Sequence, residues 1–541
     1  MARKLRSPEP LARAALGYGA KWLEALAVDE VRVALLEEAL GALDERSSAL
    51  RARLLAGLAL ALYWAESPQR RKSLSEQAVE MARRLGERTT LAYALEARHY
   101  ALWDPDHVEE RLAAANEMIG LAEGLADREL ALRGHTWRFI DLLELGDIAS
   151  VDREIEARSR LAEGLREPLQ MSLVLVSRCM RAVLDGRFDD AEHFADQARA
   201  MAEHVQPVNA EVRYASQMLL IRRQQGRSGE VEASMRSLAE RYPAVTAYRC
   251  SLAPLYGDLG REAEAREEFE RLAAADFAAL PRDVTWYSNV TFLSETCVFL
   301  CDAERAAVLY RLLLPYAMRN VVHGAALACA GAASRYLGLL GFTMSRLDDS
   351  ARHFADALEM NERMGAKPFV AHVQHEYART LLARGGPGDR EKALGLLNLA
   401  LETARELGMT KLVERALATK LRAQGIDSAD LESSIDAVAS TVETRRPDLR
   451  PTAAPDGTVT ILFSDVEGFS AMTERLGDER AHELMRQHNR IIREQIQAHG
   501  GFEVGAEGDG FMIAFSSARR GLRCAVAIQR AFAVWNAEHP E

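Results

Sequence analysis

The sequence has no long hydrophobic run. No stretch reaches the ~20 uninterrupted apolar residues that a helix needs to cross a membrane. The N-terminus, MARKLRSPEPLARAALGYG, also lacks an apolar segment before its proline and glycine residues, so it is not typical of a secretory signal. We therefore expect a soluble, cytoplasmic protein with no membrane span.

Cysteine is scarce, which excludes a disulfide-rich scaffold. The closest pair, Cys297 and Cys301, is one helical turn apart and has no histidine or second CxxC nearby, so we expect no metal site there. We expect buried thiols in a reducing compartment at every cysteine, that is at Cys179, Cys250, Cys297, Cys301, Cys329 and Cys524.

Aromatic residues make up only 6% of the chain, and basic residues are not in excess, because the formal net charge is -12. A nucleic-acid-binding surface needs clustered lysine and arginine, and no dense basic run occurs. Alanine, leucine, glutamate and arginine are abundant, which is typical of helices rather than sheets. Because 541 residues exceed what one hydrophobic core holds, we expect several structural units, most of them helical.

Much of the chain repeats with a period of about forty residues. A turn of glycine, aspartate or serine opens each unit, and a helix with an acidic first turn and apolar residues at helical spacing follows. More apolar segments, such as 171–184 and 325–341, predict a second helix in each unit. Stacked helix pairs of this kind form an α-solenoid. The units start at Glu66, Asp106, Gly146, Gly186 and Gly226, and then less regularly at Gly260, Cys301, Arg346 and Gly388.

This pattern resembles the longer tetratricopeptide repeats of large bacterial ATP-dependent signalling regulators, and the resemblance covers most of residues 7–425. In those proteins an ATPase module usually precedes the array, but no GxxxxGK(S/T) loop occurs here, so that module is absent or the chain is clipped in front. The groove of such an array implies sensing or a protein partner of unknown identity; the alternative is a structural spacer. We interpret Trp103, Trp137 and Trp286 as core residues rather than ligand contacts.

From Gly425 the repeat gives way to a predicted linker over residues 426–456. Ser428 or Asp430 could cap a helix at its start, and Pro447 and Pro451 stop any helix at its end. Two interpretations stay open, a signalling helix that pairs two chains and a helix packed on the last repeat. The first is suggested by the 4-3-4 spacing of a short seam, formed by Leu431, Ile435, Val438 and Val442.

The residues from Gly457 on change their periodicity. Segment 457–465 is a predicted strand, and a helical pattern over 471–499, broken near Gly477, ends at Gly500. Strands over 502–504 and 511–515 flank a tight turn, and Ser516 or Ser517 caps a helix from 518 to about 538. The order β-α-β-β-α predicts an α+β unit.

Two carboxylates bracket this unit, Asp465 at the end of the first strand and Asp509 in the tight turn. If the first strand neighbours the second or third, both carboxylates lie at one edge of the sheet, where a hard divalent cation and phosphates could bind. A glycine-containing loop after Asp465 would let backbone N–H groups reach a triphosphate. Spacing alone favours the simpler interpretation that both aspartates form turns.

TVTILFSDVEGFSAMTERLG followed by HGGFEVGAEGDGFMIAF resembles the front half of class III adenylate and guanylate cyclase catalytic domains, in both motifs, their order and their separation. The resemblance implies a ferredoxin-like fold, a homodimer, and two Mg²⁺ or Mn²⁺ ions held by Asp465, Asp509 and the carbonyl of Val466. In the family one ion activates the ribose 3′-hydroxyl and the other stabilises the leaving pyrophosphate. The loop implied to bind the substrate phosphates consists of Glu467, Gly468, Phe469 and Ser470.

Two features depart from the family. Gly505 stands where the family usually has a lysine that reads the purine edge, so the choice between ATP and GTP is open, although family habit favours ATP. The family domain also closes with a second βα half, which supplies another purine contact and the asparagine and arginine that stabilise the transition state. No such half follows in this sequence, so no catalytic residue is assigned beyond the metal ligands. We expect a sequence that is incomplete and inactive alone.

These observations predict a mainly α protein, with a tetratricopeptide-like α-solenoid over residues 1–425, the linker over 426–456, and a truncated class III cyclase domain over 457–541. The resemblance suggests a bacterial signal-transducing cyclase, a phosphorus–oxygen lyase that converts ATP, or less readily GTP, to a cyclic 3′,5′-nucleotide and pyrophosphate. Two alternatives are an inactive cyclase-like module on the repeat scaffold and an interaction protein in which the repeats alone act.

Overall fold

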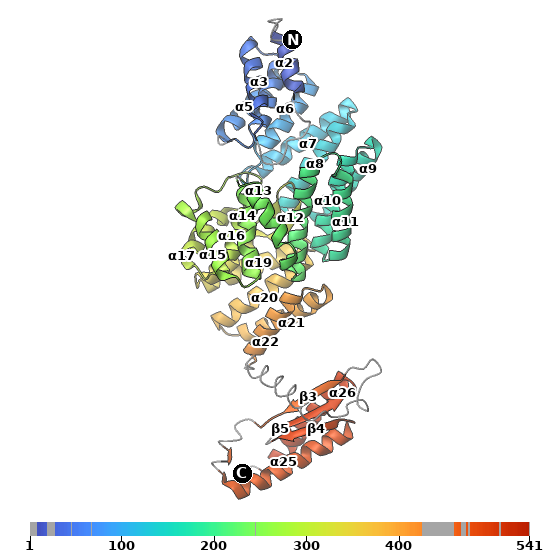
Figure 1. Cartoon of the computed structure of the whole chain (residues 1–541), viewed down its shortest axis with the longest axis vertical. Helices are drawn as coiled ribbons and strands as arrows, with labels where there is room; N and C mark the ends of the chain where they lie inside the picture. Colours follow the sequence, from blue (N-terminus) through green and yellow to red (C-terminus); the bar gives the residue numbers. More distant parts are fainter. Residues whose placement is uncertain are drawn as a thin grey trace. The chain divides into compact units, whose positions relative to one another are not determined.

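The computed structural model describes residues 8–18, 28–44, 46–65, 68–243, 245–424, 459–466, 472–473, 476–507 and 510–539. The chain divides into two compact units, Met1–Ala423 and Gln424–Glu541, drawn in Figure 1. The predicted linker helix, with Ser428, Asp430, its apolar seam from Leu431 to Val442, and the prolines after it, lies outside the described residues.

The described part of the first unit consists of helices and one short hairpin. No helix described in either unit combines the length and apolarity needed to cross a bilayer. The α-helices are α2 (Pro8–Gly17), α3 (Glu30–Ala42), α4 (Ala49–Ala61), α5 (Pro68–Leu85), α6 (Arg88–Ala101), α7 (Val108–Leu125), α8 (Arg128–Leu145), α9 (Ile148–Leu165), α10 (Pro168–Asp185), α11 (Phe188–Ala202), α12 (Pro207–Gln225), α13 (Glu232–Arg241), α14 (Thr246–Asp258), α15 (Glu262–Leu272), α16 (Trp286–Phe299), α17 (Ala303–Leu313), α18 (Ala333–Thr343), α19 (Leu347–Arg363), α20 (Lys367–Arg384), α21 (Asp389–Glu406) and α22 (Thr410–Ala423). Three short 3-10 helices are η1 (Ser228–Glu230), η2 (Ala274–Phe277) and η3 (Leu314–Tyr316), and the hairpin consists of β1 (Asn320–His323) and β2 (Ala328–Ala332).

The repeat has a local cause at the ends of its helices. Gly146, Gly186 and Gly226 end α8, α10 and α12 with φ of 83°, 80° and 79°, a conformation that glycine adopts without strain. Asp147 then caps α9, because its side chain accepts a hydrogen bond from the backbone N–H of Ser150. The predicted α-solenoid of helix pairs is confirmed, and segment 171–184 lies inside α10 as expected.

One predicted helix is wrong over its first half. Segment 325–341 is helical only from Ala333, and before it β1 and β2 form an antiparallel hairpin. The turn between them holds Gly324 and Ala326 at φ of 57° and 55°, which no right-handed helix contains. All of β2 is buried. A short apolar run buried on both faces has no alternation, so its periodicity does not distinguish strand from helix.

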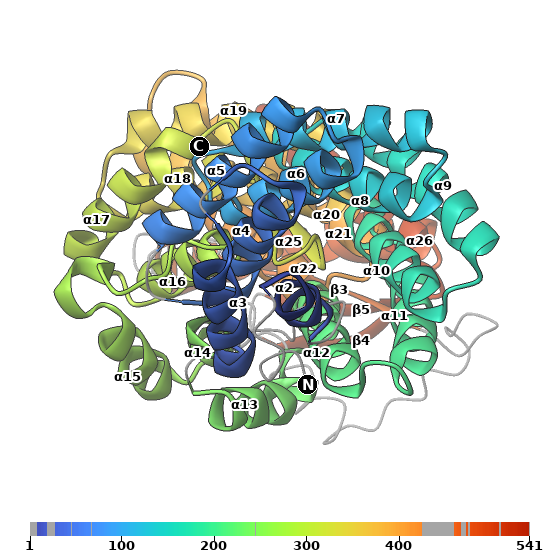
Figure 2. The same ribbon diagram turned by 90° about the horizontal axis from the view of Figure 1, so that it is seen from above.

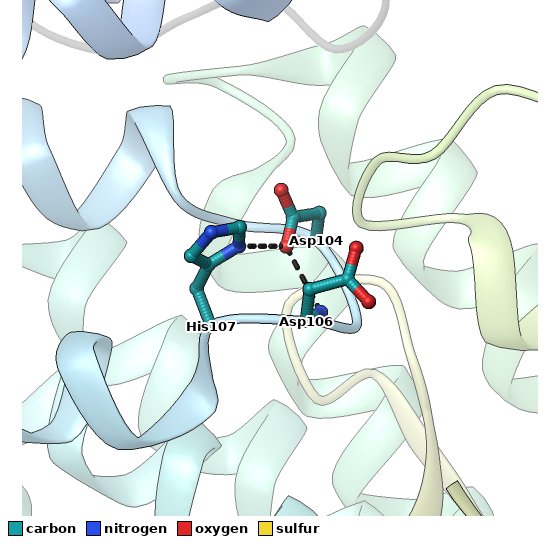
Figure 3. A group of neighbouring side chains, drawn as sticks. All are labelled: Asp104, Asp106 and His107. Atoms are coloured by element: carbon teal, nitrogen blue, oxygen red, sulfur yellow. Dashed lines mark hydrogen bonds and ion pairs between the residues drawn. The ribbon is translucent and has the colours of Figure 1, made fainter. Parts of the chain in front are cut away.

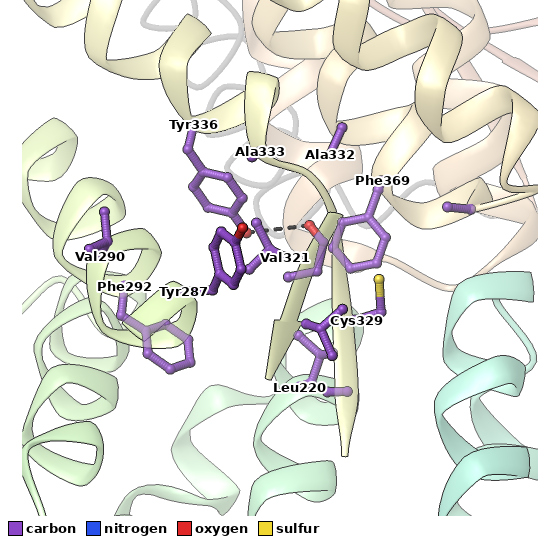
Figure 4. Packing of buried hydrophobic residues seen from close by; sticks show 14 of the residues in the cluster. Leu220, Tyr287, Val290, Phe292, Val321, Cys329, Ala332, Ala333, Tyr336 and Phe369 are labelled. Atoms are coloured by element: carbon purple, nitrogen blue, oxygen red, sulfur yellow. Dashed lines mark hydrogen bonds between the residues drawn. The ribbon is translucent and has the colours of Figure 1, made fainter. Parts of the chain in front are cut away.

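The array turns back on itself. Seen end-on, α7 to α19 follow one another around a common axis (Figure 2), and the hairpin packs against both α8 and α10. Asn320 Nδ2 donates a hydrogen bond to the carbonyl of Leu143 at 2.8 Å, and Gln217 Nε2 donates to the carbonyl of Leu327 at 3.1 Å. Buried side chains from five elements meet around the hairpin, as Figure 4 shows for Leu220, Tyr287, Val321, Cys329 and Phe369.

A group of buried charges lies where α6, α7 and α8 meet α16. Arg111 pairs with Glu144 at 2.5 Å and with Asp141 at 3.3 Å. His99 Nε2 lies 2.8 Å from Asp141 Oδ2, and Tyr287 donates to Glu144 at 3.2 Å. Burial opposes the charge of Arg111, yet Glu144 and Asp141 hold its pKa above its usual value. The group therefore links helices that are far apart in sequence through one desolvated cation.

A buried histidine in α20 makes the stability of the array depend on pH. His375 is 5% exposed and lies 3.2 Å from Thr419 Oγ1; burial, with Arg379 and Arg415 nearby, lowers its pKa to about 3. Below the ordinary pKa near 6.5 the unfolded chain takes up a proton that the folded chain does not, so stability falls as the pH falls. Between pH 6.5 and pH 5 we expect the free energy of unfolding to fall by about 2 kcal/mol less in His375→Gln than in the wild type, as measured by urea denaturation. The same substitution at the exposed His193 should leave the pH dependence of the unfolding free energy as in the wild type. If the two variants show the same pH dependence, His375 does not have this role.

The cysteines correct one expectation. Five are buried free thiols, but Cys301 is exposed. It directly follows the last turn of α16 and adopts φ of 55° in the turn before α17, which carries its side chain out of the apolar stripe. Burial raises the pKa of the Cys179 and Cys329 thiols to about 12, so these two stay protonated at neutral pH.

The second unit is an α+β layer, and its element order is the predicted β-α-β-β-α. It contains β3 (Thr460–Ser464), α25 (Asp478–Ala498), β4 (Phe502–Glu507), β5 (Gly510–Phe515) and α26 (Ala518–Glu538). The sheet order is β3-β5-β4 and both pairings are antiparallel. Ser517 caps α26, as predicted, whereas β4 extends further than the expected 502–504. One face of the sheet packs on α25 and α26 through Ile492, Ile496, Phe511, Ile513, Phe515, Cys524 and Ile528.

Candidate functional site

The strand pairing of the second unit decides which residues share an edge of the sheet. Ser464, the last residue of β3, pairs with Phe511 near the start of β5, and Glu507 pairs with Gly510 at the β4–β5 turn. The end of β3 and this turn therefore lie at the same edge. Asp465 follows β3 directly, so the condition for two carboxylates to meet there, a first strand next to the third, is fulfilled.

Asp465 is available to a cation. Its side chain is exposed and has no ion-pair or hydrogen-bond partner among the described residues. Val466 follows it at intermediate exposure. The other predicted members of the site, Asp509 and the loop Glu467, Gly468, Phe469 and Ser470, lie outside the described residues and stay predictions.

The position that departs from the family lies in β4. Gly505 pairs with Met512, and the register shifts between Glu503 and Gly505, so the strand carries an irregularity there. Met512 packs with Val504 and Ala514 in a cluster separate from the one under the helices. A lysine at position 505 would present a hydrogen-bond donor on this second face of the sheet. Gly505 has no side chain and presents none there.

The face of the sheet away from the helices is apolar and partly open. Phe463 pairs with Met512, so both lie on this face, and Phe502 pairs with Ala514 on it. Phe463 and Phe502 are each 44% exposed. Large apolar side chains on the open face of an antiparallel sheet mark a surface suited to contact with a partner.

An ion pair fixes α25 against the edge strand β4. Arg493 Nε and Nη2 each donate to Glu503 at 2.9 Å, the two-pronged geometry of a strong guanidinium–carboxylate pair. The guanidinium holds the pKa of Glu503 below its usual value. Residue types ten positions apart give no sequence pattern, so this pair was not predictable. Ser464 beside Asp465 was not predicted either; its hydroxyl is buried and has no hydrogen-bond partner among the described residues.

A second cluster could hold a metal ion by its residue types, namely Asp104, Asp106 and His107 between α6 and α7 (Figure 3). Its oxygens are already used. Asp104 accepts from His107 Nδ1 at 2.6 Å and pairs with the Lys72 ammonium at 2.7 Å, while Asp106 pairs with Arg282 at 2.9 Å. Because Lys72 and Arg282 supply the positive charge, this cluster fastens the α6–α7 loop to the loop before α16.

Comparisons with known proteins locate one family in the chain. Residues 452–535 match the model of the adenylate and guanylate cyclase catalytic domain. Over 117 residues the chain is 32% identical to an adenylate cyclase of Lachancea kluyveri, which covers 21% of this chain and 6% of that protein. It is 36% identical over 76 residues to an adenylate cyclase of Podospora anserina, with 14% and 4% covered, and 38% identical over 80 residues to receptor-type adenylate cyclase B of Leishmania donovani, with 14% and 6% covered. The chain thus spans only a small part of the length of these curated relatives.

Solved structures resemble the helical unit. The APC/C hetero-tetramer Cut9-Hcn1 is similar over 77% of this chain and 91% of that one, with a TM-score of 0.34 and 13% identity. Yeast Tom70 is similar over 78% and 97%, with a TM-score of 0.29 and 11% identity.

Proposed function

We propose that residues 452–535, which match the adenylate and guanylate cyclase catalytic domain, bind a metal–nucleoside triphosphate at the edge shared by β3 and β5. In this proposal the protein is a signalling nucleotide cyclase, and the helical array senses a ligand or partner. The observation that carries it is Asp465 at the end of β3, inside the matched segment, exposed and without an ion-pair or hydrogen-bond partner among the described residues.

The donor set fits a divalent cation. An exposed carboxylate at a strand end, with a second aspartate, Asp509, one residue before Gly510, offers the oxygen ligands that Mg²⁺ and Mn²⁺ prefer. Asp465, Asp509 and the carbonyl of Val466 would hold the ions, and residues 467–470 would bind the phosphates. Held by these residues, such ions would supply Lewis-acid chemistry that activates the ribose 3′-hydroxyl and neutralises charge on the pyrophosphate. The 3′ oxygen forms a bond to the α-phosphorus, the bond from that phosphorus to pyrophosphate breaks, and the hydroxyl proton is released.

Gly505 favours a second candidate function. Gly505 has no side chain to donate a hydrogen bond to the purine, so we expect ATP and GTP to bind with similar affinity and turnover to be slow. A unit of this kind could instead bind metal–nucleotide without converting it, as an inactive regulatory module of the array.

Metal-dependent nucleotide binding is common to both functions. Calorimetric titration of the protein expressed from its own gene with a non-cyclising ATP analogue, once with Mn²⁺ and once with a chelator in its place, tests it. We expect binding only with the metal, and its loss in Asp465→Asn. No binding under any condition, by a folded chain, would rule out both functions and leave an interaction protein in which the repeats alone act.

We expect the apolar sheet face to pair two copies of the chain. Replacing Phe463, 44% exposed on this face, by glutamate places a charge in the contact, and the dimer should dissociate at least tenfold more readily, because an unpaired charge costs more than 1.4 kcal/mol to bury. Light scattering after size-exclusion chromatography measures the mass. The control is Leu522→Glu on α26, where the leucine is 68% exposed. If Leu522→Glu dissociates the dimer and Phe463→Glu does not, the copies meet through α26 instead.

A further inference from the structure

A cavity lies inside the helical array of the first unit. Its volume is 320 Å³, which is the size of small-molecule sites in proteins. Helices from both halves of the array line it, because α6, α8, α9 and α12 contribute side chains from one half and the β1–β2 hairpin and α16 from the other. The cavity therefore exists only where the array turns back on itself.

The lining is aromatic. Trp103 and Trp137 are each 7% exposed and meet edge to face at 5.1 Å, and Phe292, labelled in Figure 4, lies on the opposite helix α16. Trp103 and Trp137 are confirmed as buried core residues, and both also line the cavity. Flat apolar walls of this kind contact a ring or an acyl chain.

The charged residues of the lining are Glu96, Arg133, Arg158 and Arg213, so three cations face one anion. Arg133 pairs with Glu96 at 3.5 Å. Arg158 donates to Ser177 Oγ at 2.8 Å and stacks on the Phe139 ring, but it has no carboxylate partner of its own, and Glu154 nearby already pairs with His135 and Arg138. Arg213 has neither an ion pair nor a hydrogen bond among the described residues. The cavity wall thus carries two uncompensated guanidinium groups.

Buried donors without acceptors gather on this wall. Arg158 is 3% exposed, and its Nε has no hydrogen-bond partner within the described part of the chain. The same holds there for Arg213 Nη2 and for the indole N–H of Trp64 and Trp137. Burial lowers the pKa of Arg158 and of Arg213 to about 10, which still leaves both charged at neutral pH. Folded proteins rarely keep buried N–H donors or a buried cation unpaired, because each costs the free energy of its lost hydration.

We infer that this cavity binds a small organic anion, whose acidic head group accepts hydrogen bonds from Arg158 and Arg213 and whose apolar body lies against Trp103, Trp137 and Phe292. A carboxylate and a phosphate monoester share the required chemistry, because both present anionic oxygens to a guanidinium. A neighbouring cavity of 630 Å³ shares Glu96, Arg133 and Gln170 with the first and provides the route of entry. Glu96 and Arg133 line both cavities, so an anion that enters the first cavity through the second would pass this ion pair.

A matched pair of fluorescent probes tests the site in the full chain. The probes are 1-anilinonaphthalene-8-sulfonate and N-phenyl-1-naphthylamine, which share the apolar body but only the first of which is an anion. Energy transfer from the tryptophans reports binding close to Trp64, Trp103 and Trp137. We expect the sulfonate to bind at least tenfold more tightly than the amine. Displacement by 1-naphthoate or by 1-naphthyl phosphate then tells which head group the site prefers, and displacement by neither would overturn the site.

Arg213→Met and Arg158→Met remove the two cations and keep much of their apolar stem. Each should weaken the sulfonate about tenfold or more and leave the neutral probe unchanged, since a hydrogen bond to a charged group is lost. A thermal melt separates ligand binding from structure, because loss of an unpaired buried cation should leave the melting temperature of Arg213→Met unchanged or raised. The control is Arg311→Met at an exposed arginine outside the cavity. Equal sulfonate affinity in wild type and both cavity variants, or a melting temperature of Arg213→Met well below that of Arg311→Met, would overturn the inference.

Discussion

Replacing Asp465 by asparagine is expected to lower cyclic nucleotide formation by about 100-fold or more, because a catalytic metal supplies several kcal/mol of charge stabilisation and each 1.4 kcal/mol is a factor of ten in rate. Asparagine keeps the size of the side chain and removes the charge that holds the cation. Product is measured with Mn²⁺ and ATP or GTP at saturating nucleotide, on protein expressed from its own gene.

A matched control separates the metal site from general damage to the second unit. Glu494 lies on the exposed surface of α25 and makes only a single-turn ion pair with Arg490 at 3.1 Å. Glu494→Gln removes the same charge at a distance from the sheet edge and should keep full activity. Equal activity of Asp465→Asn and wild type would exclude Asp465 as a metal ligand in turnover.

Replacing Arg111 by methionine is expected to destabilise the helical array by about 3–5 kcal/mol, because it leaves Asp141 and Glu144 buried without their cation. Burial already raises the pKa of Glu144, against the opposing effect of Arg111. Without Arg111 the folded chain should take up protons more readily than the unfolded chain, so the loss of stability should be smaller at pH 5 than at pH 8. Urea denaturation followed by tryptophan fluorescence measures it.

Arg311→Met is the control for this substitution as well, since Arg311 is exposed on α17. Its effect should stay within about 0.5 kcal/mol, as for most surface substitutions. A loss at Arg111 no larger than this would show that the buried charges contribute little, and that apolar packing alone holds α7 and α8 against α16.

The sequence predicts features that depend on neighbouring residues. The forty-residue repeat, the glycine turns at Gly146 and Gly186, the capping by Ser517 and the end of α25 near Gly500 follow from local hydrogen bonding and backbone preference. The cyclase motif was recognisable because its residues lie close together along the chain. The pairing of β3 with β5 was stated as a condition and is met in the structure.

Features that depend on distant residues were not predictable in this way. The contact of Asn320 with Leu143 joins residues that no repeat relates. It belongs to a hairpin whose second strand, β2, lies in the segment 325–341 that periodicity predicts as a helix. The arginines of the cavity come from three helices, α8, α9 and α12, where each alone is typical of a solvated surface. Only the closure of the array brings Arg133, Arg158 and Arg213 to one wall, where Arg158 is buried and the other two are partly exposed.

The identity of the product tests the central proposal most directly. The protein expressed from its own gene is incubated with Mn²⁺ and ATP or GTP, and the products are identified by mass spectrometry. A cyclase yields a cyclic 3′,5′-nucleotide and an equal amount of pyrophosphate, and we expect both. A folded dimer that binds metal–nucleotide but forms no cyclic nucleotide, or that releases a nucleoside diphosphate and phosphate instead, would contradict a cyclase and establish the unit of residues 452–535 as a nucleotide-binding or hydrolysing module.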